Sequence, residues 1–122
     1  MTLIEIIVAM MILTGVVMML GGFTAKFSHA NSQAHLVIAA NELASQRLDT
    51  IRQQATYGSI DLLKTSSPDT IKYDFMKFAR QTTVLRIGGG VTDSVDYKLV
   101  TVTVTAPGMR KTVTKSTAIA AF

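Results

Sequence analysis

The side chains that could perform catalysis or bind a metal are few in this 122-residue chain, and their spacing suits neither role. His29 and His35 are six residues apart, which would place them on different faces of a helix and argues against a paired metal site. Asp93 and Asp96 lie beside Ser94, but no histidine is near them in the sequence to act as a base. We therefore interpret both histidines as solvated helix residues.

The remaining signals for chemistry are equally weak. The chain has no cysteine, which excludes a disulfide, a thiolate nucleophile and a cysteine-based zinc site. The glycines at 88–90 follow a β-prone segment but lead into no helix, so a turn is favoured over a phosphate cradle. The net charge of +4 comes from scattered Lys and Arg, which does not indicate a nucleic-acid surface. The sequence therefore predicts no enzyme, no cofactor, no metal and no directly bound nucleic acid.

One acidic residue stands out because it lies beside a long apolar segment. Glu5 precedes residues 6–20, which are all apolar or small except for a single threonine. A lone charge at membrane depth costs about 2.5–3.5 kcal/mol on insertion scales. A cation about 4 Å away would offset this with roughly 4 kcal/mol of Coulomb attraction at an effective dielectric of about 20. The pattern predicts that Glu5 pairs with a cation, although a single helix could also hold this acid at the membrane interface.

The segment from Ile6 to Phe23 has the length and composition of a membrane-spanning helix. Its eighteen residues would extend about 27 Å as a helix, close to the roughly 30 Å of a hydrocarbon core. A secretory signal peptide is disfavoured because the basic n-region is missing. A buried core helix is disfavoured because so small a domain could not surround a helix that is apolar on every side. We therefore assign residues 1–25 to a transmembrane segment.

The helix is predicted to continue beyond the membrane with one apolar face. No proline occurs between Thr2 and Thr56, and Gly58 is a suitable C-terminal stop. The spacing would suit a two-stranded coiled coil, but its many alanines favour close packing of a sheet against the helix. The predicted head-packing stripe has heptad-like spacing, is interrupted only by Asn41, and consists of Phe27, Ala30, Ala34, Val37, Ala44, Leu48, Ile51 and Ala55.

The C-terminal part of the chain has the alternation of half-buried strands. Residues 57–80 mix turn residues with short apolar runs, which indicates a connecting loop with room for a short strand or helical turn. Beyond it, QTTVLRI, DYKLVTVTVT and KTVTKSTAIAAF are β-prone, whereas GGGVTDS and APGMR are turns. The expected fold class is α+β. In the predicted head, residues 26–122, an antiparallel sheet of three or four strands at 81–122 packs on the half-helix that ends near residue 55.

The segment TLIEIIVAMMIL resembles the mature N-terminus of bacterial type IV pilins and of the pseudopilins of type II secretion systems. Thr2, Leu3, Ile4 and Glu5 match that family's motif, and the order of predicted elements matches it along the whole chain. Three features depart from the family pattern. Met1 replaces the commoner Phe, the apolar segment has no proline, and the C-terminal loop has no cysteine pair.

The resemblance implies a partner for the acid. In this family a prepilin peptidase removes a basic leader, and because no such leader precedes Met1 the sequence is expected to be the mature form. The free amine of Met1, often methylated, would pair with Glu5 of a neighbouring copy, with Thr2 in the same assembly motif. Copies of the chain would lie in the inner membrane, pass through an assembly platform and form an extracellular filament.

Three glycines interrupt the apolar segment. Gly15, Gly21 and Gly22 each cost a helix about 1 kcal/mol relative to alanine. They could serve as notches for close helix packing, which membrane helices commonly use. The resemblance implies instead a stretch of helix that extends or melts when copies pack into a filament. We favour loss of helical geometry between about Gly15 and Gly22 in that assembled state.

The residue patterns and the family resemblance leave three classes of function. The favoured one is a structural subunit, a pilin whose filament serves adhesion, motility or DNA uptake. The alternative is a minor pilin or pseudopilin of a type II secretion system, because YKLVTVTVTAPGMRKTVTKSTAIA is similar to the C-terminal strands of those smaller proteins. A membrane-anchored enzyme or sensor is disfavoured because the sequence offers no site.

Overall fold

The computed structural model describes residues 2–54 and 56–121. A long helix, α1 (Leu3–Gln54), is followed by a single 3-10 turn, η1 (Ile60–Leu63). Four strands complete the chain: β1 (Asp69–Tyr73), β2 (Met76–Gly88), β3 (Asp96–Thr105) and β4 (Val113–Ala120). The chain divides between residues 34 and 35 into two compact units. The predicted uninterrupted helix and the predicted α+β class are both confirmed.

The first unit contains the N-terminal part of α1. Every residue from Thr2 to Ser32 is exposed, including all the large apolar side chains of this part. α1 is long and apolar enough to cross a membrane, and no residue of its most apolar window is buried. This unit therefore has no core of its own, and its side chains require an apolar environment that the unit does not supply.

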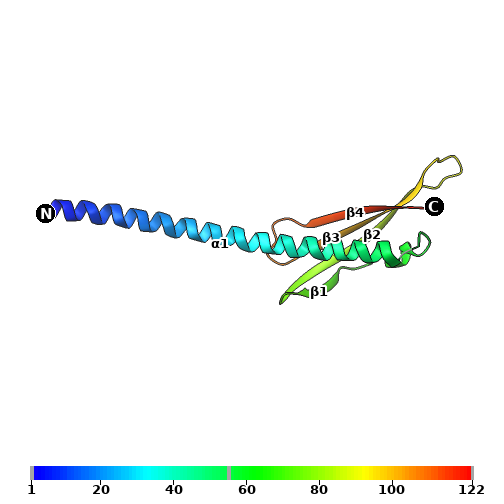
Figure 1. Ribbon diagram of the computed structural model, residues 1–122, viewed down its shortest axis with the longest axis horizontal. Helices are drawn as coiled ribbons and strands as arrows, with labels where there is room; N and C mark the ends of the chain where they lie inside the picture. The colour runs from blue at the N-terminus through cyan, green and yellow to red at the C-terminus, as the bar shows by residue number, and fades with distance from the viewer. Residues whose placement is uncertain (1, 55, 122) are drawn as a thin grey trace. The chain divides into compact units, whose positions relative to one another are not determined.

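The second unit, which we call the head, is a four-stranded antiparallel sheet with residues 35–54 of α1 packed on one face (Figure 1). The strands follow the order β1-β2-β3-β4, so each strand pairs with the next one in the chain. This meander needs only turns between neighbouring strands, and the β1–β2 turn consists of just Asp74 and Phe75. The arrangement leaves the other face of the sheet open to solvent or to a partner.

The core of the head forms where inward side chains of the sheet meet one face of α1. Val100, Val102 and Val104 of β3 are fully buried, and the threonines that alternate with them are only half-buried. Phe78 of β2 and Ile60 of η1 belong to the same buried cluster. The residues that α1 contributes are Leu36, Ala40, Leu43, Ala44, Leu48 and Ile51.

The predicted head-packing stripe is correct only in the last part of α1. Ala44, Leu48 and Ile51 are buried as predicted, and the predicted Ala55 lies outside the described residues. The face that packs on the sheet also includes residues that the stripe left out, namely Leu36, Ala40 and Leu43.

The earlier positions of the stripe are wrong. Phe27 is 66% exposed and Val37 is 37% exposed, and Ala30 and Ala34 are exposed as well. Phe27, Ala30 and Ala34 belong to the first unit, which has no core. Val37 lies in the head, but a strict heptad spacing rotates by about 20° per heptad around a straight α-helix, so the line that is buried near Ile51 has drifted off the packed face there. The head accordingly begins at residue 35 and not at residue 26.

The predicted loop over residues 57–80 allowed a short strand or a helical turn, and the structure has both, but the predicted start of the sheet at residue 81 is wrong. This segment contains η1, all of β1 and the beginning of β2, so the sheet begins at Asp69 and not at residue 81. Short alternation places Ile71 and Tyr73 against the core while Thr70 and Lys72 face outward. The hairpin escapes sequence analysis because its turn residues, Asp74 and Phe75, include no glycine or asparagine.

Substitution of a buried strand residue tests the orientation of the sheet. Val102→Asp should destabilise the head by more than about 4 kcal/mol, because it places an unpaired charge in the core. Thr103→Asp, one residue further on the opposite face, should change stability by less than about 1 kcal/mol. Near-ultraviolet circular dichroism of the full chain in detergent micelles, followed through thermal unfolding, measures both. Retention of the wild-type unfolding temperature by Val102→Asp would mean that the strand faces are reversed.

Candidate functional site

The N-terminal end of α1 carries the only acidic residue of the first unit, Glu5. The backbone N–H of Thr2 donates to Oε2 of Glu5 over 3.4 Å. The backbone N–H groups of Glu5 and Ile6 donate to the carbonyl of Thr2 over 3.1 and 3.4 Å. Glu5 forms no ion pair with any residue that the structure describes, and its predicted partner, the amine of Met1, lies outside those residues.

This geometry reveals a local role for the acid that the sequence analysis missed. Thr2 precedes the first helical residue, and Glu5 lies three residues later, which is the spacing of a capping box. In that motif the acidic side chain accepts a hydrogen bond from the backbone N–H at the start of the helix, as Glu5 does here. A carboxylate has about four acceptor positions, so this single long bond leaves Glu5 able to bind a cation as well.

The glycines of the apolar segment have no structural requirement within the chain. The helix runs unbroken through Gly15, Gly21 and Gly22, and a Cβ atom added to any of them would meet nothing within 4 Å. Gly15 borders an open hollow of about 380 Å³ whose other lining residues include Ile7, Met11 and Thr14. Alanine would therefore fit at all three positions and improve helix propensity. The predicted loss of helical geometry concerns a filament, so it stays a prediction.

The residues singled out by sequence for chemistry have other roles. His29 and His35 are exposed on α1. Oδ2 of Asp93 accepts a hydrogen bond of 2.9 Å from the backbone N–H of Gly90 and so shapes the β2–β3 turn. Among the described residues, no group of three or more His, Asp or Glu side chains is placed to hold a metal ion.

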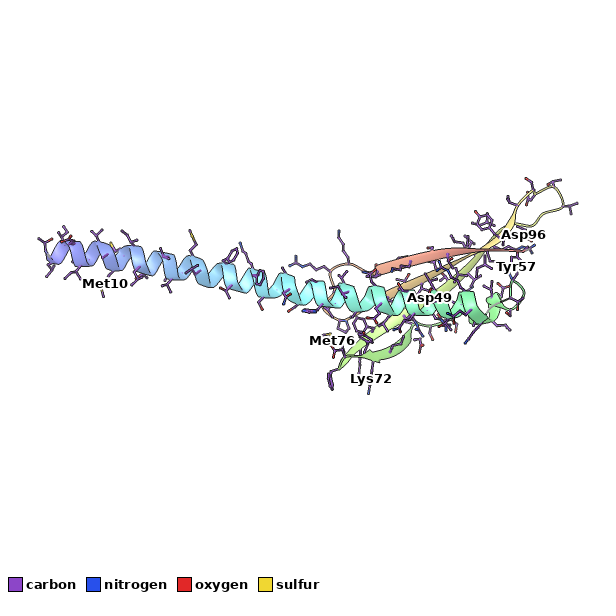
Figure 2. All side chains as sticks on the ribbon, viewed as in Figure 1. Met10, Asp49, Tyr57, Lys72, Met76 and Asp96 are labelled. Carbon is purple, nitrogen blue, oxygen red and sulfur yellow. The ribbon has the colours of Figure 1, made fainter. Side chains whose placement is uncertain are left out.

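Asp96 belongs to a polar cluster at the end of the head where β2 gives way to β3, close to the residues that follow α1 (Figure 2). Arg86 donates to both carboxylate oxygens of Asp96, over 3.0 and 2.7 Å, and the hydroxyl of Tyr57 donates to the same carboxylate. Nζ of the buried Lys98 donates to the carbonyl of Tyr57 and to Oδ2 of Asp61, both over 2.8 Å. These bonds tie the segment after α1 to β2 and β3, as a disulfide could do in an oxidised chain.

The cluster lowers the pKa of Asp96 and raises the pKa values of Tyr57 and Arg86. The Arg86 guanidinium and the Tyr57 hydroxyl hold the pKa of the Asp96 carboxyl below its usual range. The hydrogen bond to Asp96 raises the pKa of the Tyr57 phenol. The lower pKa of Asp96 keeps its carboxylate ionised and the higher pKa of Tyr57 keeps its phenol neutral over a wide pH range, which includes neutral pH.

No family model, no curated protein and no solved structure matches this chain.

Acid titration tests the polar cluster. The pKa of Asp96 is lowered in the fold, so its stabilising effect is complete above the ordinary carboxyl pKa of about 4 and is lost as pH falls through the lower folded value. Asp96→Asn should therefore lower head stability at pH 7 and weaken its loss on acidification. Tyr57→Phe removes one bond and keeps the Arg86 pair, so it should have a smaller effect. Thermal unfolding between pH 2 and pH 7 would contradict this if Asp96→Asn retained the wild-type profile.

Glycine replacement tests the role of the apolar segment's flexibility. Gly21→Ala with Gly22→Ala should add roughly 1 kcal/mol of helix stability per site, because nothing in the chain opposes the added methyl groups. We expect slower hydrogen exchange from residues 15–22 in micelles and impaired assembly or extensibility of any filament. Gly58→Ala, which lies outside the segment and is also free of close contacts, is the control. A filament map with unbroken helical hydrogen bonds from Leu3 to Gln54 would contradict the predicted break.

Proposed function

We propose that this chain is a structural subunit of the type IV pilin class, which polymerises through the N-terminal part of α1 into an extracellular filament for adhesion, motility or DNA uptake. Its copies are held in the inner membrane before assembly. The partners of the chain are copies of itself, the inner-membrane assembly platform and, before maturation, the prepilin peptidase.

The observation that carries this proposal is that every residue from Thr2 to Ser32 is exposed. Large side chains such as Leu13, Met18 and Met19 are 64%, 74% and 79% exposed, and the residues on every side of this part of α1 are exposed as well. Burying each such side chain is worth about 1.5–3 kcal/mol. Lipid supplies that environment to a single chain, and neighbouring copies of α1 can supply it in a filament. The resemblance of TLIEIIVAMMIL to pilins favours the second environment as the final one.

Glu5 adds a negatively charged group to the N-terminal end of this apolar surface. The one hydrogen bond that its carboxylate accepts within the described residues, from Thr2, does not neutralise the negative charge. In a bundle of parallel helices, the carboxylate can accept a cationic amine from a neighbouring copy without entering lipid unpaired. The acid thereby favours the assembled state over the isolated membrane helix and sets the axial register between copies.

The head supports this role through its independence from the apolar segment. Its sheet and its buried cluster involve residues from Leu36 onward, so the head retains its core while residues 3–34 change environment from lipid to protein. A subunit that must leave a membrane without unfolding needs such a division. The alternative function, a minor pilin or pseudopilin of a type II secretion system, requires the same division and would differ in the length of its assemblies.

Charge removal at Glu5 separates the cation-binding role from the capping role. Glu5→Gln removes the charge, but its amide oxygen can still cap Thr2, whereas Glu5→Val removes both. If pairing with a cation drives assembly, both variants should lower filament yield at least tenfold while the amount of chain in membranes stays unchanged or rises. Asp49→Asn, which removes an exposed acid further along α1, is the matched control and should assemble normally.

The measurement is the amount of this chain in sheared surface material, together with negative-stain images of that material. Normal yield from Glu5→Gln with failure of Glu5→Val would mean that capping, and not ion pairing, is the contribution of the acid. If cells that produce the wild-type chain form no filaments with this chain as the main component, the pilin proposal is overturned. Short assemblies that contain it as a minor component would favour the pseudopilin alternative.

A further inference from the structure

The β1–β2 turn carries an unusual combination of backbone and side chain. Asp74 and Phe75 have φ angles of +47° and +63°, in the left-handed region that favours glycine and asparagine. Phe75 occupies the position where such two-residue turns usually have glycine, and its phenyl ring is fully exposed. A bulky residue in this conformation is strained, and an exposed ring is poorly hydrated. Neither feature contributes to folding, so the turn suggests a role outside the chain.

The residues beside Phe75 are also an exposed apolar side chain and charged groups that do not stabilise the hairpin. Met76 is 49% exposed, and Lys72 and Lys77 face each other directly across the two strands. Like charges at paired positions destabilise a hairpin, and neither lysine forms an ion pair with a residue that the structure describes. We call Phe75 and Met76, with these two lysines, the turn knob.

A second apolar surface lies on the open face of the sheet, away from α1. Strand register places Leu85 opposite Leu99 and Leu99 opposite Ala118, and the next row pairs Ile87 with Tyr97. Leu85 is 61% exposed, although it lies mid-sheet where the neighbouring row is made of threonine and serine. We call this surface the outer-sheet patch, which consists of Leu85, Ile87, Tyr97, Leu99, Ala118 and Ala120.

The turn knob and the outer-sheet patch lie at opposite ends of the head. β2 leads from one to the other, since Met76 begins the strand and Leu85 and Ile87 lie near its end, and thirteen residues of strand span about 40 Å. Figure 2 shows Lys72 and Met76 at one end and Asp96, which begins β3 beside the patch, at the other. Leu36 and Met76 line one hollow of about 200 Å³, so the turn knob lies at the end where α1 enters the head.

We propose that the turn knob of one copy docks on the outer-sheet patch of a second copy, a contact that rests on the filament function proposed above and names its head-to-head surfaces. Two different surfaces at opposite ends of one body form a heterologous contact, which repeats without closing and generates a filament. In a filament of identical copies every head has the same surroundings, so all heads have the same orientation along it. The knob end of each head then meets the patch end of the next.

Charge and size agree with this occupant. Asp93 is exposed on the 89–95 turn next to the patch, where it can approach Lys72 or Lys77 of the docked copy. Burial of a phenylalanine ring removes roughly 150–250 Å² of surface, far below the roughly 1,600 Å² of a standard stable interface. The contact therefore acts only when packed helices already hold the heads close together, and heads alone stay monomeric.

Cross-linking tests the contact directly because the chain has no cysteine. Asp74→Cys and Thr83→Cys place thiols beside the turn knob and beside the outer-sheet patch without altering either. In sheared filaments a short bis-maleimide should join the double variant into a ladder of covalent multimers. Asp74→Cys with Leu62→Cys, whose second site is 85% exposed but lies on η1, is the control and should give no ladder.

The outcomes distinguish this inference from the function on which it rests. A ladder from the first pair and not from the control supports the docking. Filaments without a ladder, or dimers from either single variant alone, would overturn the docking and leave the pilin proposal in place. Failure of the wild-type chain to form filaments overturns the pilin proposal, and the docking falls with it.

A substitution that spares the fold provides the second test. Phe75→Asn suits the left-handed backbone, so the unfolding temperature of the head should stay constant or rise while filament yield after shearing falls at least fivefold. Leu85→Thr, which matches the neighbouring Thr83, should have the same effect from the patch side. Leu62→Asn is the control for loss of an exposed apolar residue. Wild-type filament yield from both Phe75→Asn and Leu85→Thr would overturn the proposal.

Discussion

The packing of α1 against the inward valines of β3 is the constraint on which the head depends. Val100, Val102 and Val104 have no exposed surface, and Ala40 and Ala44 of the helix have none either. Small side chains on the helix let its backbone approach branched side chains on the strand, which gives dense contact in a domain with little volume for a core. Because this contact determines which sheet face is inward, it also determines which side chains are left for a partner.

The N-terminal unit follows a different physical rule. It has no buried residue that the structure describes from Thr2 to Ser32, so hydrogen bonds within the helix hold its backbone while its large apolar side chains stay exposed. Glu5 accepts a hydrogen bond from the backbone N–H of Thr2 at the start of this helix, and its carboxylate keeps a negative charge that no described residue neutralises. Of these two parts, only the head has a buried core of its own.

The polar contacts and the exposed apolar residues of the head differ in what they contribute to its stability. The buried Lys98 and the Arg86–Asp96 pair each form two hydrogen bonds of 3.0 Å or less, so they stabilise the junction after α1. Phe75 and Leu85 are apolar residues whose exposure stabilises nothing within the chain. Local rules are obeyed in the core and broken at these surface positions, which is where we propose contact with another copy.

Sequence periodicity by itself determined the long helix, the α+β class and the inward face of β3, because each depends on a local repeat of 3.6 or 2 residues. It misplaced the N-terminal part of the head-packing stripe. A stripe through Phe27 and one through Leu36 are equally regular in the sequence, and only packing against the sheet decides which of them is buried. It allowed a short strand between residues 57 and 80 but did not include that strand, β1, in the sheet, because the β1–β2 turn has no glycine. Cross-strand register alone brought Leu85, Leu99 and Ala118 together, because residues far apart in the chain become neighbours only when strands pair.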